Sequence, residues 1–162
     1  MLKNWSNIAL VAVSHTQKLL DELDFAFNSR LSSAFGSIHL KNGVTTEQLI
    51  REMLNINHSK RKITELKNAV ETSLASLDAN HRDILTKRIL SKMSFREIAD
   101  ADCISLRTAF RRFESAQLAL LRALRRQGYS EERLTIEFAE IPQLAAIAER
   151  LGGENYFVAS RE

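Results

Sequence analysis

Hydrophobic residues recur every three or four positions over long parts of this 162-residue chain, which is the period of amphipathic helices. The first such stripe predicts a helix over 16–35, closed by Gly36. One proline and five glycines leave little to interrupt helices, so we expect a mainly α, multi-helix fold. The stripe consists of Leu20, Leu23, Phe27, Leu31 and Ala34.

Three further helices are expected before residue 91. Thr45 and Gln48 have capping-box spacing and open a helix over 45–55. Asn57-His58-Ser59 predicts a break, after which a helix runs over 60–76. Asp78 is expected to cap the next helix, which ends near Leu90.

Two capped helices follow in close succession. Ser94 and Glu97 form another capping box, so a helix of two turns begins there and ends within 100–103. Ser105 caps a longer helix over 106–127, which Gly128 ends. Two helices joined by so short a turn predict a helix-turn-helix. The buried face of the long helix is expected to carry Ala109, Phe113, Ala116, Leu120 and Leu124.

Polar residues occupy the opposite face of the long helix at its start. Arg107, Thr108 and Arg111 project from the first two turns, where a recognition helix enters the major groove. Arginine suits this position because its planar guanidinium binds guanine O6 and N7, or a phosphate, through two hydrogen bonds. The alternative interpretation is a solvated helix face.

The pattern changes beyond Gly128. Residues 134–138 alternate as a strand does, Pro142 opens a short helix that Gly152-Gly153 closes, and 156–158 is a candidate second strand. This predicts a small strand–helix–strand appendage. A single helix followed by a loose tail is the alternative.

Charge is unevenly distributed, although the net charge is only +3. Residues 78–127 carry eleven Lys or Arg and six Asp or Glu, whereas 128–162 carry three and seven. A basic middle suits a polyanion partner. Lys60-Arg61-Lys62 is interpreted as a charged helix start, with phosphate binding as the competing hypothesis.

Other kinds of chemistry lack a sequence signal. The single cysteine forms no internal disulfide, which fits a reducing cytoplasm. No histidine pair has zinc-binding spacing, and no phosphate loop or nucleophile elbow occurs, so we expect no metal, no cofactor and no enzyme activity. The longest apolar run, Ile8 to Val13, is too short to span a membrane. We therefore expect a soluble cytoplasmic protein without a membrane partner.

Residues 74–124, LASLDANHRDILTKRILSKMSFREIADADCISLRTAFRRFESAQLALLRAL, resemble region 4 of bacterial sigma-70-type factors, a module also found in phage transcription regulators. With the preceding helix, the resemblance covers about 63–127, two-fifths of the chain. The matching positions are Leu77, Arg82, Ile84, Leu85, Arg88, Ser94, Glu97, Ile98, Ala99, Ile104, Ser105, Thr108, Arg112 and Ala116.

The resemblance implies binding to double-stranded DNA through the second helix of the turn. It implies base contacts from Leu106, Arg107, Thr108 and Arg111. Phosphate contacts, or bracing of the turn, would come from Lys92, Arg96 and Arg112. With Ser105 at the start of the helix, the implied DNA-binding set is Lys92, Arg96, Ser105, Leu106, Arg107, Thr108, Arg111 and Arg112.

Two residues depart from the family pattern in the turn. Asp102 stands where the family usually has a leucine, and we expect it to face solvent or to pair with a nearby arginine. Cys103 stands where the family usually has glycine, and a positive φ there would cost on the order of 1 kcal/mol.

Three regions follow from these observations. Residues 1–58 are an N-terminal helical region for dimerisation or docking, 59–128 the DNA-binding domain, and 129–162 an acidic appendage. Because 1–62 lack the basic and aromatic residues that melt a promoter, a regulator acting with RNA polymerase is favoured over a complete sigma factor. The alternatives are a region-4-like module that binds proteins instead of DNA, and a phage DNA-packaging or replication protein.

Overall fold

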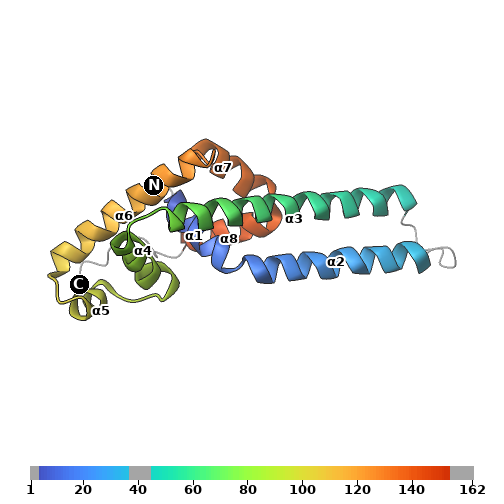
Figure 1. Ribbon diagram of the computed structural model, residues 1–162. Helices are drawn as coiled ribbons and strands as arrows, with labels where there is room; N and C mark the ends of the chain where they lie inside the picture. The colour runs from blue at the N-terminus through green and yellow to red at the C-terminus, as the bar shows by residue number, and fades with distance from the viewer. Residues whose placement is uncertain (1–3, 37–44, 154–162) are drawn as a thin grey trace. The chain divides into compact units, whose positions relative to one another are not determined.

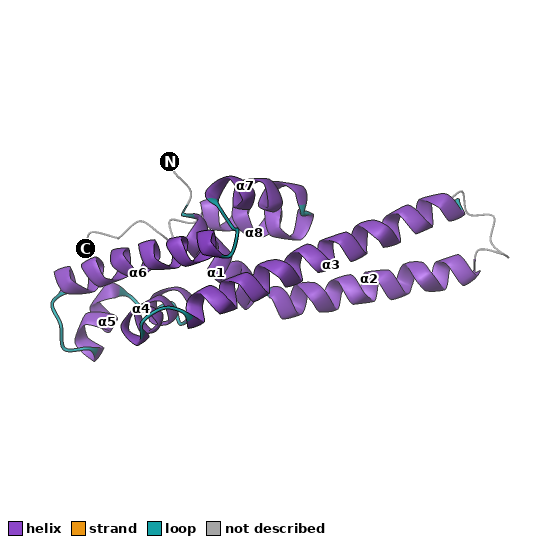
Figure 2. Cartoon of the chain, turned by 45° about the horizontal axis from the view of Figure 1, so that its top comes forward, coloured by secondary structure: helices purple, strands orange, loops and turns teal. Residues whose placement is uncertain are grey.

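In a computed structural model of the chain, which describes residues 4–36 and 45–153, the regular elements are helices and the described residues contain no strand (Figures 1 and 2). This confirms the mainly α class. The helices of the described residues are α1 (Trp5–Ser14), α2 (Thr16–Gly36), α3 (Thr46–Ala75), α4 (Ala79–Leu85), the π-helical turn η1 (Thr86–Leu90), α5 (Phe95–Ala101), α6 (Leu106–Arg126), α7 (Glu131–Glu140) and α8 (Pro142–Gly153).

The chain divides into two compact units, and the division is not continuous in sequence. One unit, here the hairpin unit, is His15–Leu66. The other, here the main unit, consists of Met1–Ser14 and Lys67–Glu162. The functional regions predicted above stay predictions, and the compact units divide the chain at different residues.

In the hairpin unit, α2 lies alongside the first part of α3 (Figures 1 and 2). The predicted helix over 16–35 is confirmed, with Leu19 and Leu23 buried. Its apolar stripe becomes more exposed along the helix, and Leu31 is already 37% exposed. An ion pair of 2.7 Å between Arg30 Nε and Glu52 links the two helices farther along.

The predicted break at 57–59 is wrong, because α3 is one continuous helix of 30 residues. Asn, His and Ser each cost only up to about 0.7 kcal/mol in a helix, and neither Gly nor Pro is present to stop it. The capping box at its start is confirmed: the Thr45 and Gln48 backbone N–H groups donate to each other's side chains at 3.0 and 3.2 Å. Lys60-Arg61-Lys62 therefore lies within a helix and not at a helix start.

The core of the main unit is built on α1, for which the sequence patterns predicted no helix. Its apolar run is too short to show a helical period, yet Ile8, Ala9 and Leu10 are at most 2% exposed. α1 contacts α6, α7, α8 and η1, whereas α4 and α5 both pack on α6. The first apolar residues of the chain are thus central to the unit that also holds the candidate site.

The helix expected to end near Leu90 is divided in the structure. Ile84, Leu85 and Ile89 are buried as predicted, but the last five residues form the π-helical turn η1. Asp78 occupies the N-cap position of α4, although its side chain makes no capping hydrogen bond.

The predicted strand over 134–138 is wrong, since these residues lie inside α7. The alternation is ambiguous because Leu134, Glu137 and Phe138, all buried, also follow helical spacing. Ser130 caps α7 by accepting a hydrogen bond of 3.2 Å from the Arg133 N–H. Pro142 opens α8 as predicted, and the second candidate strand, 156–158, lies outside the described residues.

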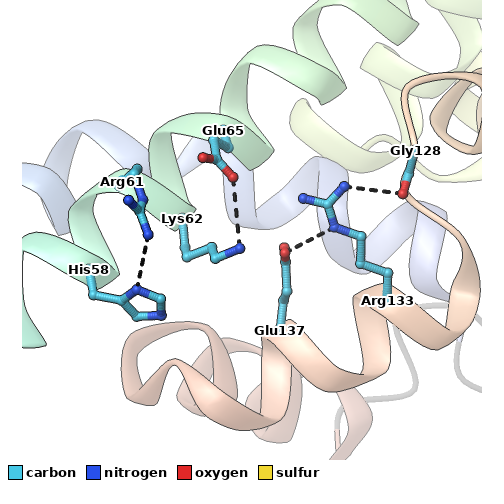
Figure 3. Close-up of polar contacts among 7 residues, drawn as sticks. All are labelled: His58, Arg61, Lys62, Glu65, Gly128, Arg133 and Glu137. Carbon is cyan, nitrogen blue, oxygen red and sulfur yellow. Dashed lines mark hydrogen bonds and ion pairs between the residues drawn. The ribbon is translucent and has the colours of Figure 1, made fainter.

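α7 is tied to the turn that precedes it. Arg133 Nε donates to Glu137 Oε1 at 3.0 Å, and its Nη1 donates to the Gly128 carbonyl at 3.2 Å (Figure 3). The guanidinium also lies 3.9 Å from the centre of the Tyr129 ring. Because α7 packs on α8 and both contact α1, the described part of the predicted appendage belongs to the main unit.

Alanine substitutions distinguish the helix from a strand at this position. A strand would place residues 134 and 136 on one face, whereas in α7 Leu134 is fully buried and Ile136 is 55% exposed. We expect Leu134→Ala to lower the free energy of unfolding by about 2–5 kcal/mol and Ile136→Ala to change it by less than about 1 kcal/mol. Urea unfolding measures both, and equal losses would contradict the helical assignment.

Candidate nucleic-acid interface

The candidate site is built on α5 and α6, which are joined by residues 102–105. The predicted capping box at the start of α5 is confirmed. The Ser94 N–H donates to Glu97 Oε2 at 2.7 Å, and the Glu97 N–H donates to Ser94 Oγ at 3.1 Å. The hydrogen bond from the Ser94 backbone to the carboxylate, with a smaller contribution from the Ser94 side chain, holds the pKa of Glu97 below its ordinary value.

Aromatic side chains hold α5 against α6. The Phe95 ring lies 4.3 Å from the ring of Phe110 and 5.2 Å from that of Phe113, measured between centroids. Arg88 completes this cluster: its guanidinium lies 4.6 Å from the Phe95 ring centre and donates to the Met93 carbonyl at 3.0 Å. Burial lowers the pKa of Arg88. Our sequence predictions placed Phe113 on the buried face of the long helix but did not include the contacts of Phe95 and Phe110.

The connection between the helices begins with a left-handed residue. Cys103 has φ of 53°, a left-handed backbone conformation that glycine adopts most readily. The Ile104 N–H donates to the Ala99 carbonyl at 3.0 Å and the Cys103 N–H to the Asp100 carbonyl at 3.3 Å. This pair of bonds is a Schellman motif, which satisfies the last carbonyls of α5 and reverses the chain direction.

We expected Asp102 to face solvent or to pair with an arginine, but it is half-buried and pairs with a lysine. Lys87 Nζ lies 2.7 Å from Asp102 Oδ1 and 2.7 Å from Asp83 Oδ2. Hydrogen bonds to Asp102 and then to Asp83 raise the pKa of Lys87. The Asp102 carboxylate is therefore paired with a lysine of η1, which it shares with Asp83. Only the Asp83–Lys87 spacing of four residues was visible in the sequence.

The exposed start of α6 matches the predicted face. The predicted buried residues of α6 are all buried, and Arg107 and Arg111 lie one turn apart on the opposite side, both exposed. Ser105 caps the helix by accepting a hydrogen bond of 3.1 Å from the Thr108 N–H. The Thr108 hydroxyl lies 2.8 Å from Ser105 Oγ, and Leu106 is half-buried.

The remaining predicted residues are exposed on these helices or in the segment before them. Arg96 on α5 and Arg112 on α6 are exposed, as is Lys92, which has φ of 57° in the segment before α5. Within the described residues, Arg96, Arg107, Arg111 and Arg112 form no ion pair. Four guanidinium groups are therefore available to an anionic partner.

The basic run of the hairpin unit differs, because Lys60 and Lys62 form ion pairs and Arg61 contacts a histidine ring; Figure 3 shows the contacts of Arg61 and Lys62. Lys60 forms an ion pair with Asp24. Arg61 Nη2 lies 3.4 Å from His58 Nδ1, and Lys62 Nζ lies 3.9 Å from Glu65. This pairing favours a structural role for the run over the phosphate hypothesis.

Other kinds of site find no support in the described part of the chain. No group of three His, Cys, Asp or Glu residues there is arranged to hold a metal ion. None of its helices combines the length and apolar character needed to cross a bilayer. Compared with protein-family models, with curated proteins and with solved structures, the chain shows no match. A functional assignment therefore depends on the residues themselves.

Two matched substitutions test the backbone strain. We expect Cys103→Gly to raise the free energy of unfolding by about 0.5–1 kcal/mol, because relief of the left-handed strain exceeds the added entropy of the unfolded chain. Gly128→Ala should lower it by about 1–2 kcal/mol, since φ is 86° there and an added Cβ would lie 3.3 Å from Arg133 Nη1. Cys103→Ala keeps the Cβ and is the control. Urea unfolding measures all three. If Cys103→Gly is no more stable than Cys103→Ala, the left-handed backbone at Cys103 is not strained.

The capping box should appear in the pH dependence of stability. Because the folded pKa of Glu97 lies below its unfolded value of about 4.3, the stabilisation is present above that pH and is lost as the pH falls through the folded pKa. Glu97→Gln keeps an acceptor but does not titrate. We expect the parent protein to be more stable than this variant at neutral pH and the difference to vanish in acid. Glu140→Gln, at the end of α7, is the control. If the difference in the free energy of unfolding between the parent protein and Glu97→Gln does not change with pH, the capping box does not lower the pKa of Glu97.

Proposed function

We propose that this chain binds specific sequences in double-stranded DNA and acts in transcription, with α5 and α6 as a helix-turn-helix of the sigma region 4 kind. The observation that carries the proposal is the pair of exposed arginines, Arg107 and Arg111, on the first two turns of a capped helix whose other face is buried. Recognition helices present their N-terminal turns to base edges in the major groove.

The roles of the side chains follow from their placement. Arg107 and Arg111 bind base edges, because a guanidinium donates two parallel hydrogen bonds to guanine O6 and N7. Ser105 and Thr108 set the start of the helix, and the Thr108 methyl group and Leu106 offer apolar contact to a thymine methyl.

Arg96, Arg112 and Lys92 are assigned to phosphates. They are exposed at the edges of the same surface, where they supply affinity without reading sequence. A protein that neutralises several phosphates releases counterions, so its affinity falls steeply with salt. The charge of residues 78–127, eleven basic against six acidic side chains, supports this division of roles.

RNA polymerase is the partner that the resemblance to sigma region 4 suggests. A regulator fits better than a complete sigma factor, because the hairpin unit carries paired charges and no cluster of aromatic and basic residues on one helix. The hairpin unit is then the part available for dimerisation or for docking to polymerase.

Alanine substitutions on α6 test the choice of reading helix. On a duplex selected from random sequence, we expect Arg107→Ala and Arg111→Ala each to weaken binding by about 1–3 kcal/mol and to relax specificity. Arg122→Ala removes an exposed arginine from the same helix, about 22 Å along its axis from Arg107. We expect it to change the binding free energy by only a few tenths of a kcal/mol. Fluorescence anisotropy at several salt concentrations measures all three.

Two results would contradict the proposal. Equal losses for Arg107→Ala, Arg111→Ala and Arg122→Ala would mean that charge, and not the start of α6, accounts for binding. If the folded parent protein fails to bind any duplex at about 50 mM salt, where phosphate contacts are strong, the chain is a protein-interaction module.

A further inference from the structure

The main unit also contains a pocket away from the start of α6. Its volume is about 400 Å³, within the size range of small ligand sites. The start of α1, the middle of α6 and the start of α7 form its walls. The lining residues are Asn4, Trp5, Ser6, Glu114, Gln117, Leu118, Leu121 and Glu131.

Large apolar side chains form one side of the pocket. The Trp5 ring is held in place by the Phe138 ring, 5.4 Å away between centroids and tilted by 51°. Leu118 is 53% exposed, although it lies between charged residues on the outer face of α6. A pocket that exposes leucine beside a fixed indole suits an apolar or aliphatic group of a partner.

The charge of the pocket is negative. Glu131 is partly neutralised by Arg125, whose Nη2 lies 3.6 Å away, and by the first turn of α7. Glu114 is exposed and forms no ion pair within the described residues, so it supplies the net charge. It also interrupts a row of arginines, because Arg107, Arg111 and Arg122 share its face of α6.

We propose that this pocket binds a basic side chain, flanked by apolar residues, on a protein partner. Glu114 attracts the cation, and Leu118 and Leu121 cover the aliphatic neighbours. A nucleic-acid phosphate would meet Glu114 with like charge. Glu114 lies about 10 Å along the helix axis from Arg107 but only about 4.5 Å from Arg111, so the pocket borders the proposed DNA-binding face of α6.

Tryptophan fluorescence tests this proposal directly, because Trp5 is the single tryptophan of the chain. The full-length protein is titrated with the tripeptide acetyl-Leu-Arg-Leu-amide and with the matched acetyl-Leu-Gln-Leu-amide. We expect a saturable change, with the arginine peptide binding about two- to fivefold more tightly, as one exposed ion pair allows. Glu114→Gln should abolish the preference, whereas Glu140→Gln, outside the pocket, should keep it; circular dichroism confirms that both variants are folded.

Several outcomes would overturn the proposal. Equal binding of the two peptides would make the pocket an apolar contact without charge selection. A preference that survives Glu114→Gln would assign the cation to another site. Tighter binding of acetyl-Leu-Glu-Leu-amide would mean that the pocket prefers an acidic side chain. The absence of any saturable change would mean that the pocket does not bind these peptides. None of these results bears on DNA binding by the start of α6, which the Arg107 and Arg111 variants test separately.

Discussion

The main unit depends on the burial of α1. Its run of small and branched apolar residues contacts α6, η1, α7 and α8, so one short helix near the start of the chain covers the inner surfaces of elements from its second half. Each buried large side chain contributes about 1.5–3 kcal/mol of stabilisation. α6 can turn Arg107 and Arg111 outward because α1, α4 and α5 occupy its opposite face. The candidate interface is therefore a consequence of how the core is packed.

The short α5 helix is held by local interactions on three sides. The capping box closes its start, the Schellman motif closes its end, and the Phe95 cluster fixes it on α6. Lys87 adds a fourth constraint by pairing with Asp102 in the connection. An ion pair thus replaces the apolar contact that a leucine would make, and it links the position of the connection to η1. π-helical turns are rare overall and are frequent at functional sites.

Sequence patterns predicted the parts of this fold that local rules determine. α2 and α6 were predictable because each combines a helical apolar period with clear ends. The break in α3 and the strand at 134–138 were wrong, because weak breakers and short alternations are decided by tertiary packing. α1 was missed because six apolar residues carry no period. In the candidate site, the outward direction of Arg107 and Arg111 followed from helical geometry. The pairing of Lys87 with Asp102 did not, since it joins segments that meet only in the folded chain.

The position of α1 has a consequence for how the protein is made. During synthesis the N-terminal residues emerge first, but the surfaces that bury α1 belong to helices near the other end of the chain. The hairpin unit lies between them in sequence and can form from neighbouring residues alone. The apolar side chains of α1 therefore stay exposed until most of the chain has left the ribosome. Such long-range contacts slow folding and leave apolar surface open to aggregation over that interval.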